Sequence, residues 1–299
     1  MANGAITVGG KSPLSRIADR LPLQTLKALL RHRLSVFSLI YITIATGAAV
    51  FAGPLSPYDP NAIDPVNALA PPSWAHPLGL DDVGRDVFSR LLYGARVSME
   101  VGLLSATLAI VVGVPLGVIA AYAGGWTEHI IMRIIDAKIA IPNILLAILL
   151  VIVMGGGVFT VSLALSLNLM TTQARLVRSQ ALSVKQLDYV LAAKALGVPP
   201  RRILAAHVLP NAFQPSIVQA TLGMGFAVLG EAGLSFLGVG VTIPTPTWGN
   251  MLNLAFQNME SAPWLSIAPG LAIFLLVLSF NFVGDGLRDV LDPRLRGRV

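Results

Sequence analysis

The sequence predicts an all-α integral membrane protein with about six transmembrane helices and with both termini in the cytoplasm. The 299 residues are 55% hydrophobic and only 12% charged, whereas about a quarter of the residues of a soluble domain are charged. Several apolar stretches reach about 20 residues, enough for a helix to cross a hydrocarbon core of about 30 Å. With the N-terminus inside, 18 of the 21 Lys and Arg residues fall on the cytoplasmic side, as the positive-inside rule requires.

The first part of the chain divides into three segments. Residues 1–33 are polar and basic, which predicts a cytoplasmic N-terminal segment, and residues 34–53 form the first transmembrane anchor. Residues 54–98 are rich in Pro and Asp and form a segment outside the cytoplasm, with a short amphipathic helix at 84–96. This segment either covers the mouth of a pore as a flap or contacts a partner protein.

Residues 99–283 are predicted to form a core of five further spans, followed by a cytoplasmic tail at 284–299. The first of these spans contains Gly113-Val-Pro-Leu-Gly117, and two glycines four residues apart allow another helix to approach closely. The five predicted spans are 99–122, 130–154, 158–175, 211–237 and 264–283.

Two polar residues within the spans are candidates for a solute path or gate. Asn168 lies in the span 158–175, where a polar side chain either bonds a neighbouring helix or lines a path. Glu231 lies near the outer end of the span 211–237 and is either a hydrogen-bonded helix-end residue or a gate. Beyond Glu231 and a charged group around Asp136, the spans are expected to hold no ionic solute tightly.

Residues 183–210 form a polar segment between two spans and are the strongest local signal in the chain. Ser183 and Gln186 have the spacing of a capping box, which predicts a helix start. Gly197, Pro199 and Pro200 then predict a helix end followed by a second short helix. The pattern indicates a helical hairpin suited to docking a partner.

This segment resembles the signature of the membrane-spanning permeases of binding-protein-dependent ABC importers. That signature reads Glu-Ala-Ala, three residues, Gly, nine residues, Ile, one residue, Leu-Pro. The matching positions here are Ala192, Ala193, Gly197, Leu209 and Pro210.

Two positions depart from the general signature. His207 replaces Ile, as in the dipeptide, oligopeptide and nickel branch of the family, and Leu191 replaces Glu, which removes a salt bridge with the ATPase. The stretches 76–98, 234–240, 244–252 and 284–296 also resemble segments of the C-type subunit of peptide permeases.

The resemblance implies a type I ABC importer permease fold in the bacterial inner membrane. It implies partnership with a homologous permease subunit, two ATPase subunits, an external solute-binding protein and the lipid bilayer, with ATP and magnesium bound only by the ATPases. The solute would be a di- or oligopeptide, or instead nickel, glutathione or an opine. The ATPase-coupling residues that it implies are Leu191, Ala192, Ala193, Lys194, Ala195, Leu196, Gly197, His207, Leu209 and Pro210.

Other function classes have little support in the sequence. The chain has no cysteine and four scattered histidines, a composition that offers no metal cluster or redox centre. Gly9-Gly10-Lys11-Ser12 lacks the earlier glycine of a phosphate loop, because Ala5 stands there. The net charge of +6 fits cytoplasmic loops better than nucleic-acid binding. An ion-coupled secondary transporter and a membrane-embedded enzyme remain as alternatives, although neither inverted repeats nor clustered acids are found.

Overall fold

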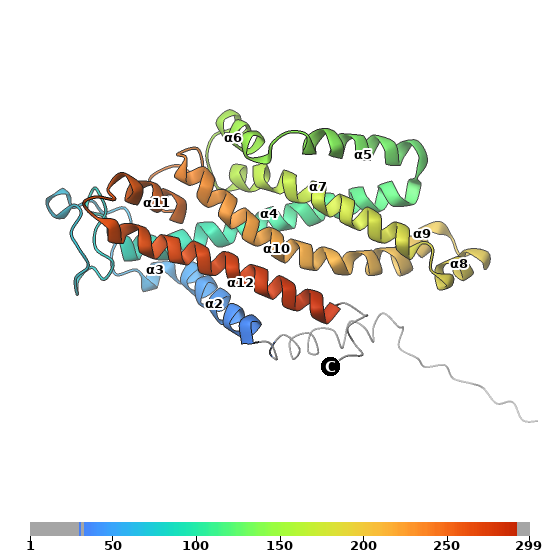
Figure 1. Cartoon of the computed structure of the whole chain (residues 1–299), viewed down its shortest axis with the longest axis horizontal. Coiled ribbons are helices and arrows are strands. Elements are labelled where there is room, and N and C mark those ends of the chain that lie inside the picture. Colours follow the sequence, from blue (N-terminus) through green and yellow to red (C-terminus); the bar gives the residue numbers. More distant parts are fainter. Residues whose placement is uncertain (1–29, 31–32, 292–299) are drawn as a thin grey trace, which may run out of the picture.

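The computed structural model describes Leu30 and residues 33–291, and these residues are almost entirely helical (Figure 1). They contain no strand beyond one isolated bridge between Leu80 and Asp86. The longer helices are α2 (Arg33–Val50), α4 (Val87–Ala123), α5 (Gly125–Ile139), α6 (Asn143–Met154), α7 (Val158–Val184), α8 (Asp188–Ala195), α10 (Leu209–Phe236), α11 (Trp248–Gln257) and α12 (Ile267–Leu291). The shorter turns are α3 (Ala52–Leu55), η1 (Pro65–Asn67), α9 (Pro200–Ile203), η2 (Leu204–Val208) and η3 (Pro263–Ser266).

The long helices run up and down along one axis and give the bundle two different ends (Figure 1). The hairpin of α8 and α9 lies at one end, which we call the hairpin end. Residues 56–86 and α11 lie at the other, which we call the loop end. Helix α2 begins, and α12 ends, on the side that faces the hairpin end.

Four helical stretches are long and apolar enough to cross a membrane. They are α2, α4, α9 with α10, and η3 with α12, and the pair α5 and α6 makes a fifth if it is counted as one bent span. The predicted span at 158–175 begins where α7 begins, but α7 does not meet the same criterion and continues to Val184. Four to five of the six predicted spans are therefore confirmed, and a crossing by α7 stays a prediction.

Helix α4 differs from the prediction of a short helix at 84–96 followed by a separate span. It is one helix of 37 residues, about 55 Å long, because nothing between Val87 and Met99 interrupts its hydrogen bonds. Asp86 caps its start, since Oδ2 accepts a hydrogen bond from Ser89 N at 2.7 Å. Because α4 is longer than a hydrocarbon core is thick, part of it must lie outside the membrane.

The predicted packing of the glycine pair in α4 is confirmed. A Cβ atom on Gly113 would lie 2.7 Å from the carbonyl oxygen of Met170, and one on Gly117 would lie 2.4 Å from that of Ala174. Since real Cβ atoms do not come so close to backbone atoms, α4 and α7 can meet here only through glycine.

The stretch predicted as one span at 130–154 is not one continuous helix. Helix α5 ends at Ile139, α6 begins at Asn143, and the two helix axes meet at 88°. Pro142 lies at the break and disfavours a helical conformation for Ile141 before it. Two ion pairs join α5 to α7: Arg175 donates to Asp136 and Arg178 donates to Glu128. The two halves are thus attached to α7 in different ways: α5 through ion pairs, with only Ile135 buried, and α6 through apolar packing of Ala147 and Val151.

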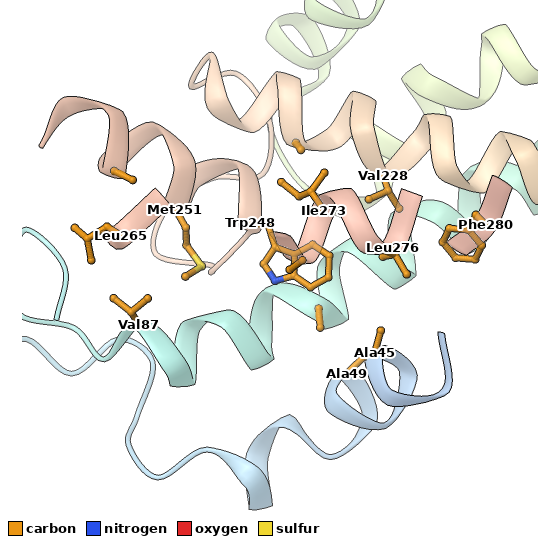
Figure 2. Close-up of a cluster of buried hydrophobic side chains, with 14 of the residues drawn as sticks. Ala45, Ala49, Val87, Val228, Trp248, Met251, Leu265, Ile273, Leu276 and Phe280 are labelled. Carbon is orange, nitrogen blue, oxygen red and sulfur yellow. The ribbon is translucent and has the colours of Figure 1, made fainter. Parts of the chain in front are cut away.

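The loop end is built around a buried apolar cluster. Figure 2 shows Trp248 of α11 between α4 and the part of α12 that carries Ile273 and Leu276. The Trp248 indole donates a hydrogen bond from Nε1 to Leu91 O at 2.9 Å, and its ring lies against Gly94. This contact fixes α11 on the first turns of α4.

Buried charges hold residues 56–86 against the same helix. Asp81 accepts from Arg85 Nε at 2.7 Å, and Arg90 Nη1 donates to Pro60 O at 2.9 Å. Arg90 is only 1% exposed, and its Nε lies 3.6 Å from Asp81 Oδ2. The segment predicted as an extramembrane loop is thus a fixed part of the fold.

Candidate functional site

The turn between α8 and α9 has the geometry that the sequence predicts. Gly197 has φ = 72°, in the left-handed region that glycine adopts without steric cost. Val198 N donates to Ala193 O at 3.1 Å, and Gly197 N donates to Lys194 O at 3.1 Å. This pair of bonds is the Schellman motif, which satisfies the last carbonyls of α8. Pro200 then occupies the first turn of α9, so the hairpin has one defined shape.

The predicted helix start at Ser183 is wrong. Helix α7 continues to Val184, and Ser183 Oγ donates to Ser179 O within it. Val177, Ala181 and Val184 are buried on α7, and this packing outweighs the local capping signal. Helix α8 begins instead at Asp188, without a side-chain cap.

An apolar cluster attaches the hairpin to the bundle. Val190 of α8 and Ile203 of α9 are buried in it together with Val118 of α4 and Val177 of α7. Lys185, between α7 and α8, donates from Nζ to Ala121 O at 2.8 Å at the end of α4. A displacement of the hairpin is therefore transmitted to both α4 and α7.

His207 lies where the hairpin returns to the membrane helices. It is half-buried in η2, a turn of π-helix, and its ring meets the Tyr189 ring edge-on at 5.8 Å. Asn211 Nδ2 donates to both His207 O (2.6 Å) and Tyr189 Oη (3.2 Å). The start of α8 and the start of α10 are thereby joined, a link that sequence reasoning missed because Tyr189 carries no motif.

The outer surface of the hairpin is apolar in spite of its charged neighbours. Leu191 is 51% exposed and Leu196 is 84% exposed. Ala192, Lys194 and Ala195 are exposed between them, and Ala193 is half-buried. Leu209 and Pro210 begin α10, with Leu209 exposed and Pro210 half-buried. An exposed apolar tip on a fixed support can be buried by a partner protein.

Glu231 is far from the hairpin and fully buried. Its Oε1 accepts a hydrogen bond from Ser235 Oγ at 2.7 Å, and the same hydroxyl accepts from Val241 N at 3.2 Å. These bonds join the last turns of α10 to the segment that leads to α11. The contacts favour the interpretation as a hydrogen-bonded residue near a helix end, and a gating role stays a prediction.

Asn168 lies on α7 and faces the break between α5 and α6. Its Oδ1 accepts a hydrogen bond from Lys138 Nζ at 3.2 Å. Neither Asn168 nor Glu231 is near the hairpin, so the predicted residues divide into one docking surface and two separate positions within the bundle. Among the described residues, no group of His, Cys, Asp and Glu side chains has the arrangement of a metal site.

Comparisons with known proteins match nearly the whole chain. Residues 113–297 match the family model of the binding-protein-dependent transport system inner membrane component, and residues 23–72 match the N-terminal transmembrane domain of oligopeptide transport permease C.

Several relatives are similar over most of their length. The dipeptide transport system permease protein DppC of Alkalihalophilus pseudofirmus is 43% identical, with 91% of this chain and 90% of that protein covered. The glutathione transport system permease protein GsiD of Pectobacterium atrosepticum is 42% identical, with 90% of each covered. DppC of Haemophilus influenzae is 39% identical, with 95% and 99% covered.

A solved structure supports the fold. A chain of an inward-facing structure of the MetNI methionine ABC transporter superposes with a TM-score of 0.56 at 21% identity. The superposition covers 67% of this chain and 96% of that chain. At this identity the similarity concerns the fold alone.

Proposed function

The chain belongs to the family of binding-protein-dependent transport system inner membrane components and is a permease subunit of an ABC importer in the bacterial inner membrane. From this premise we propose how the subunit works within the importer. The observation that carries the proposal is the fixed hairpin with an exposed apolar tip, at the position of the family's coupling signature.

We propose that the hairpin docks on one of two ATPase subunits. Leu191 and Leu196 would be buried in a groove of the ATPase, and Lys194 would remain at the rim of the contact. Because Leu191 replaces an acidic residue, this contact rests on apolar burial, worth about 1.5–3 kcal/mol for each fully buried leucine. Closure of the ATPase dimer would then shift α4 and α7 through the cluster that contains Val190 and Ile203.

The remaining partners complete the transporter. A homologous permease subunit would form the other half of the path, and an external solute-binding protein would deliver the solute. This chain would bind no cofactor and perform no chemistry, with ATP and magnesium held by the ATPases.

The proposed solutes are short peptides. Relatives named for dipeptide and glutathione transport are 43% and 42% identical to this chain, so identity does not choose between them. Glutathione is itself a short peptide with free carboxylates, so both names describe one chemical class.

The test is import of labelled alanylalanine or glutathione into vesicles that contain the four membrane-associated subunits together with the binding protein. We expect import to stop when the catalytic glutamate of the ATPases is replaced, while an imposed proton or sodium gradient is kept intact. Import that continues under the ion gradient alone would favour a secondary transporter and contradict this function.

A further inference from the structure

Three polar side chains converge at the break between α5 and α6. Lys138, in the last turn of α5, donates from Nζ to Asn143 Oδ1 at 2.7 Å and to Asn168 Oδ1 at 3.2 Å. An ammonium group has three N–H donors, so one remains for another acceptor. The Nδ2 groups of both asparagines also have no acceptor among the described residues. The cluster therefore presents hydrogen-bond donors and a positive charge.

No carboxylate within the described part of the chain neutralises this charge. The acidic residues that face α7 from α5 are both engaged elsewhere, Asp136 with Arg175 and Glu128 with Arg178. The described residues place no Asp or Glu within salt-bridge distance of Lys138. Lys138 belongs to the charged group around Asp136 that the sequence sets apart from the otherwise mostly uncharged spans, and the fold turns it toward α7.

The break cannot face lipid. Residues 139–145 are all exposed, and the carbonyl groups of Ala140 and Ile141 accept no hydrogen bond from the described residues. Unsatisfied backbone groups and a lysine are each costly in hydrocarbon, and irregular backbone at membrane depth is found where it lines water or contacts protein. This face of the bundle therefore borders an aqueous path or another subunit.

A cleft of about 180 Å³ lies beside the cluster. It is lined by residues of three helices: Asn143 and Ile144 of α6, Asn168 and Leu169 of α7, and Phe226 and Gly230 of α10. Asn168 follows the first residue of α7 by ten positions, about 15 Å along the axis, which is half the thickness of a typical hydrocarbon core. The cleft is mostly apolar, with the charge at one edge, as a site for a small solute with one anionic group would be.

We propose that Lys138, Asn143 and Asn168 form a binding site for the carboxylate of the transported solute, with the solute's apolar part in the cleft. This inference rests on the proposed function, because it assigns the site to a peptide-like solute in transit. The carboxylate would accept from Lys138 Nζ and from the two amide groups, and such charge-assisted bonds are the stronger kind. The site gives the permease a preference for carboxylate-bearing solutes that is independent of the binding protein.

The first experiment tests the charge and the access to water without any solute. Phe226, which lines the cleft and is 64% exposed, is changed to cysteine (Phe226→Cys) in the complete transporter. This chain contains no other cysteine, so the unsubstituted chain measures the background from partner subunits. The cysteine is reacted with an anionic sulfonate and with a cationic trimethylammonium methanethiosulfonate, each rate being normalised to that of a free thiol, with and without ATP.

We expect the anionic reagent to react faster, because a positive charge at the edge of the cleft acts with opposite sign on the two reagents. An effective separation of about 6 Å in water would make the difference about tenfold. Lys138→Met should abolish the preference and Lys138→Arg should keep it. Asn168→Asp should also abolish it, because the new carboxylate would pair with Lys138 in place of a ligand. Arg133→Gln, a change of an exposed cation on the same helix, is the matched control and should leave the preference intact.

Two outcomes would overturn the site. Equal rates with Lys138 present would mean that another subunit neutralises the charge. No reaction with either reagent in either nucleotide state would mean that lipid or a subunit covers the face.

A second experiment links the site to transport. In vesicles that import alanylalanine, Lys138→Met should lower import by about tenfold or more, because a hydrogen bond to a charged group contributes about 1.5–3 kcal/mol. Stimulation of the ATPase by the loaded binding protein should stay normal, and Lys138→Arg should restore import. Unchanged import in Lys138→Met contradicts a role in transit. If the wild type imports neither alanylalanine nor glutathione but keeps its anion preference, the proposed function fails while the anion site stands.

Discussion

The two ends of the bundle are stabilised in different ways. At the loop end, buried charges and a buried tryptophan hold residues 56–86 and α11, with Arg90 and Trp248 only 1% and 2% exposed. At the hairpin end, the shape comes from backbone geometry at Gly197 and from one apolar cluster, while Leu191 and Leu196 are left exposed.

The difference indicates that the loop end is internally complete, whereas the hairpin end is incomplete by itself. A buried ion pair holds one geometry, because removing either partner leaves an uncompensated charge. A Schellman turn also holds one geometry, but it leaves its outer surface free for a partner. We therefore expect changes at the loop end to lower stability, and changes at the hairpin end to lower coupling to the ATPase.

The largest expected effect concerns which side of the membrane each end faces. Ser73→Cys at the loop end should react with an impermeant thiol reagent added outside intact cells. Lys194→Cys on the hairpin should react only after the membrane is made permeable. Labelling by gel shift measures both, and the opposite pattern would reverse the predicted orientation.

The next effect is on stability at the loop end. Asp81→Ala should lower the free energy of unfolding by about 3 kcal/mol, since it removes the buried carboxylate that pairs with two buried arginines. Asp82→Ala is the matched control, because the Asp82 side chain is 31% exposed and makes a longer contact, with Oδ1 3.5 Å from Arg85 Nη2 and no hydrogen bond. We expect it to lose about 1 kcal/mol or less. Thermal unfolding in detergent compares the two variants. Equal losses would mean that burial of the charge does not matter here.

The effect at Gly197 should appear in activity rather than in stability. Gly197→Val places a β-branched side chain at φ = 72°, with a strain of about 1–2 kcal/mol. The turn should relax by moving the tip, so that binding-protein-stimulated ATPase activity falls about tenfold or more. Gly197→Asn should keep most of the activity, because asparagine tolerates this left-handed conformation. Wild-type coupling in the valine variant would show that the shape of the turn is unimportant.

The smallest effect should come from Tyr189. Tyr189→Phe removes the hydrogen bond from Asn211 but keeps the ring against His207, so ATPase stimulation should change less than twofold. Tyr189→Ala also removes the aromatic contact, worth about 0.5–1.5 kcal/mol, and should reduce stimulation several-fold. If the two variants reduced ATPase stimulation equally, the loss would come from the hydrogen bond to Asn211 and not from the contact with the His207 ring.

The sequence predicts best where one local feature decides the structure. Backbone preferences alone predict that one helix ends just before Gly197 and that a second helix starts at Pro200. The structure confirms both positions. The glycine pair Gly113 and Gly117 likewise predicts a close helix contact. The prediction at Ser183 failed, because the residues have the spacing of a capping box but the packing of α7 continues the helix past them.

The cluster at Lys138 could not be predicted from the sequence. Hydropathy along 130–154 reports that the stretch is apolar but not that it bends by 88° at Pro142. Asn168 is thirty positions away, and only the packing of α5 and α6 on α7 brings its amide to the lysine. The residues of the coupling signature are close in sequence, whereas those of the cluster are close only in space.

The continuity of α4 has a mechanical consequence. Gly94, against Trp248, and Ala121, in the cluster under the hairpin, are 27 positions apart on one helix, about 40 Å along its axis. A tilt of about 5° that leaves one of these points in place displaces the other by about 3.5 Å over that length. A small rotation of α4 imposed at the hairpin end thus shifts the backbone next to Trp248 by about the width of an atom. In a variant whose three other tryptophans are replaced, the fluorescence of Trp248 would report the angle of α4.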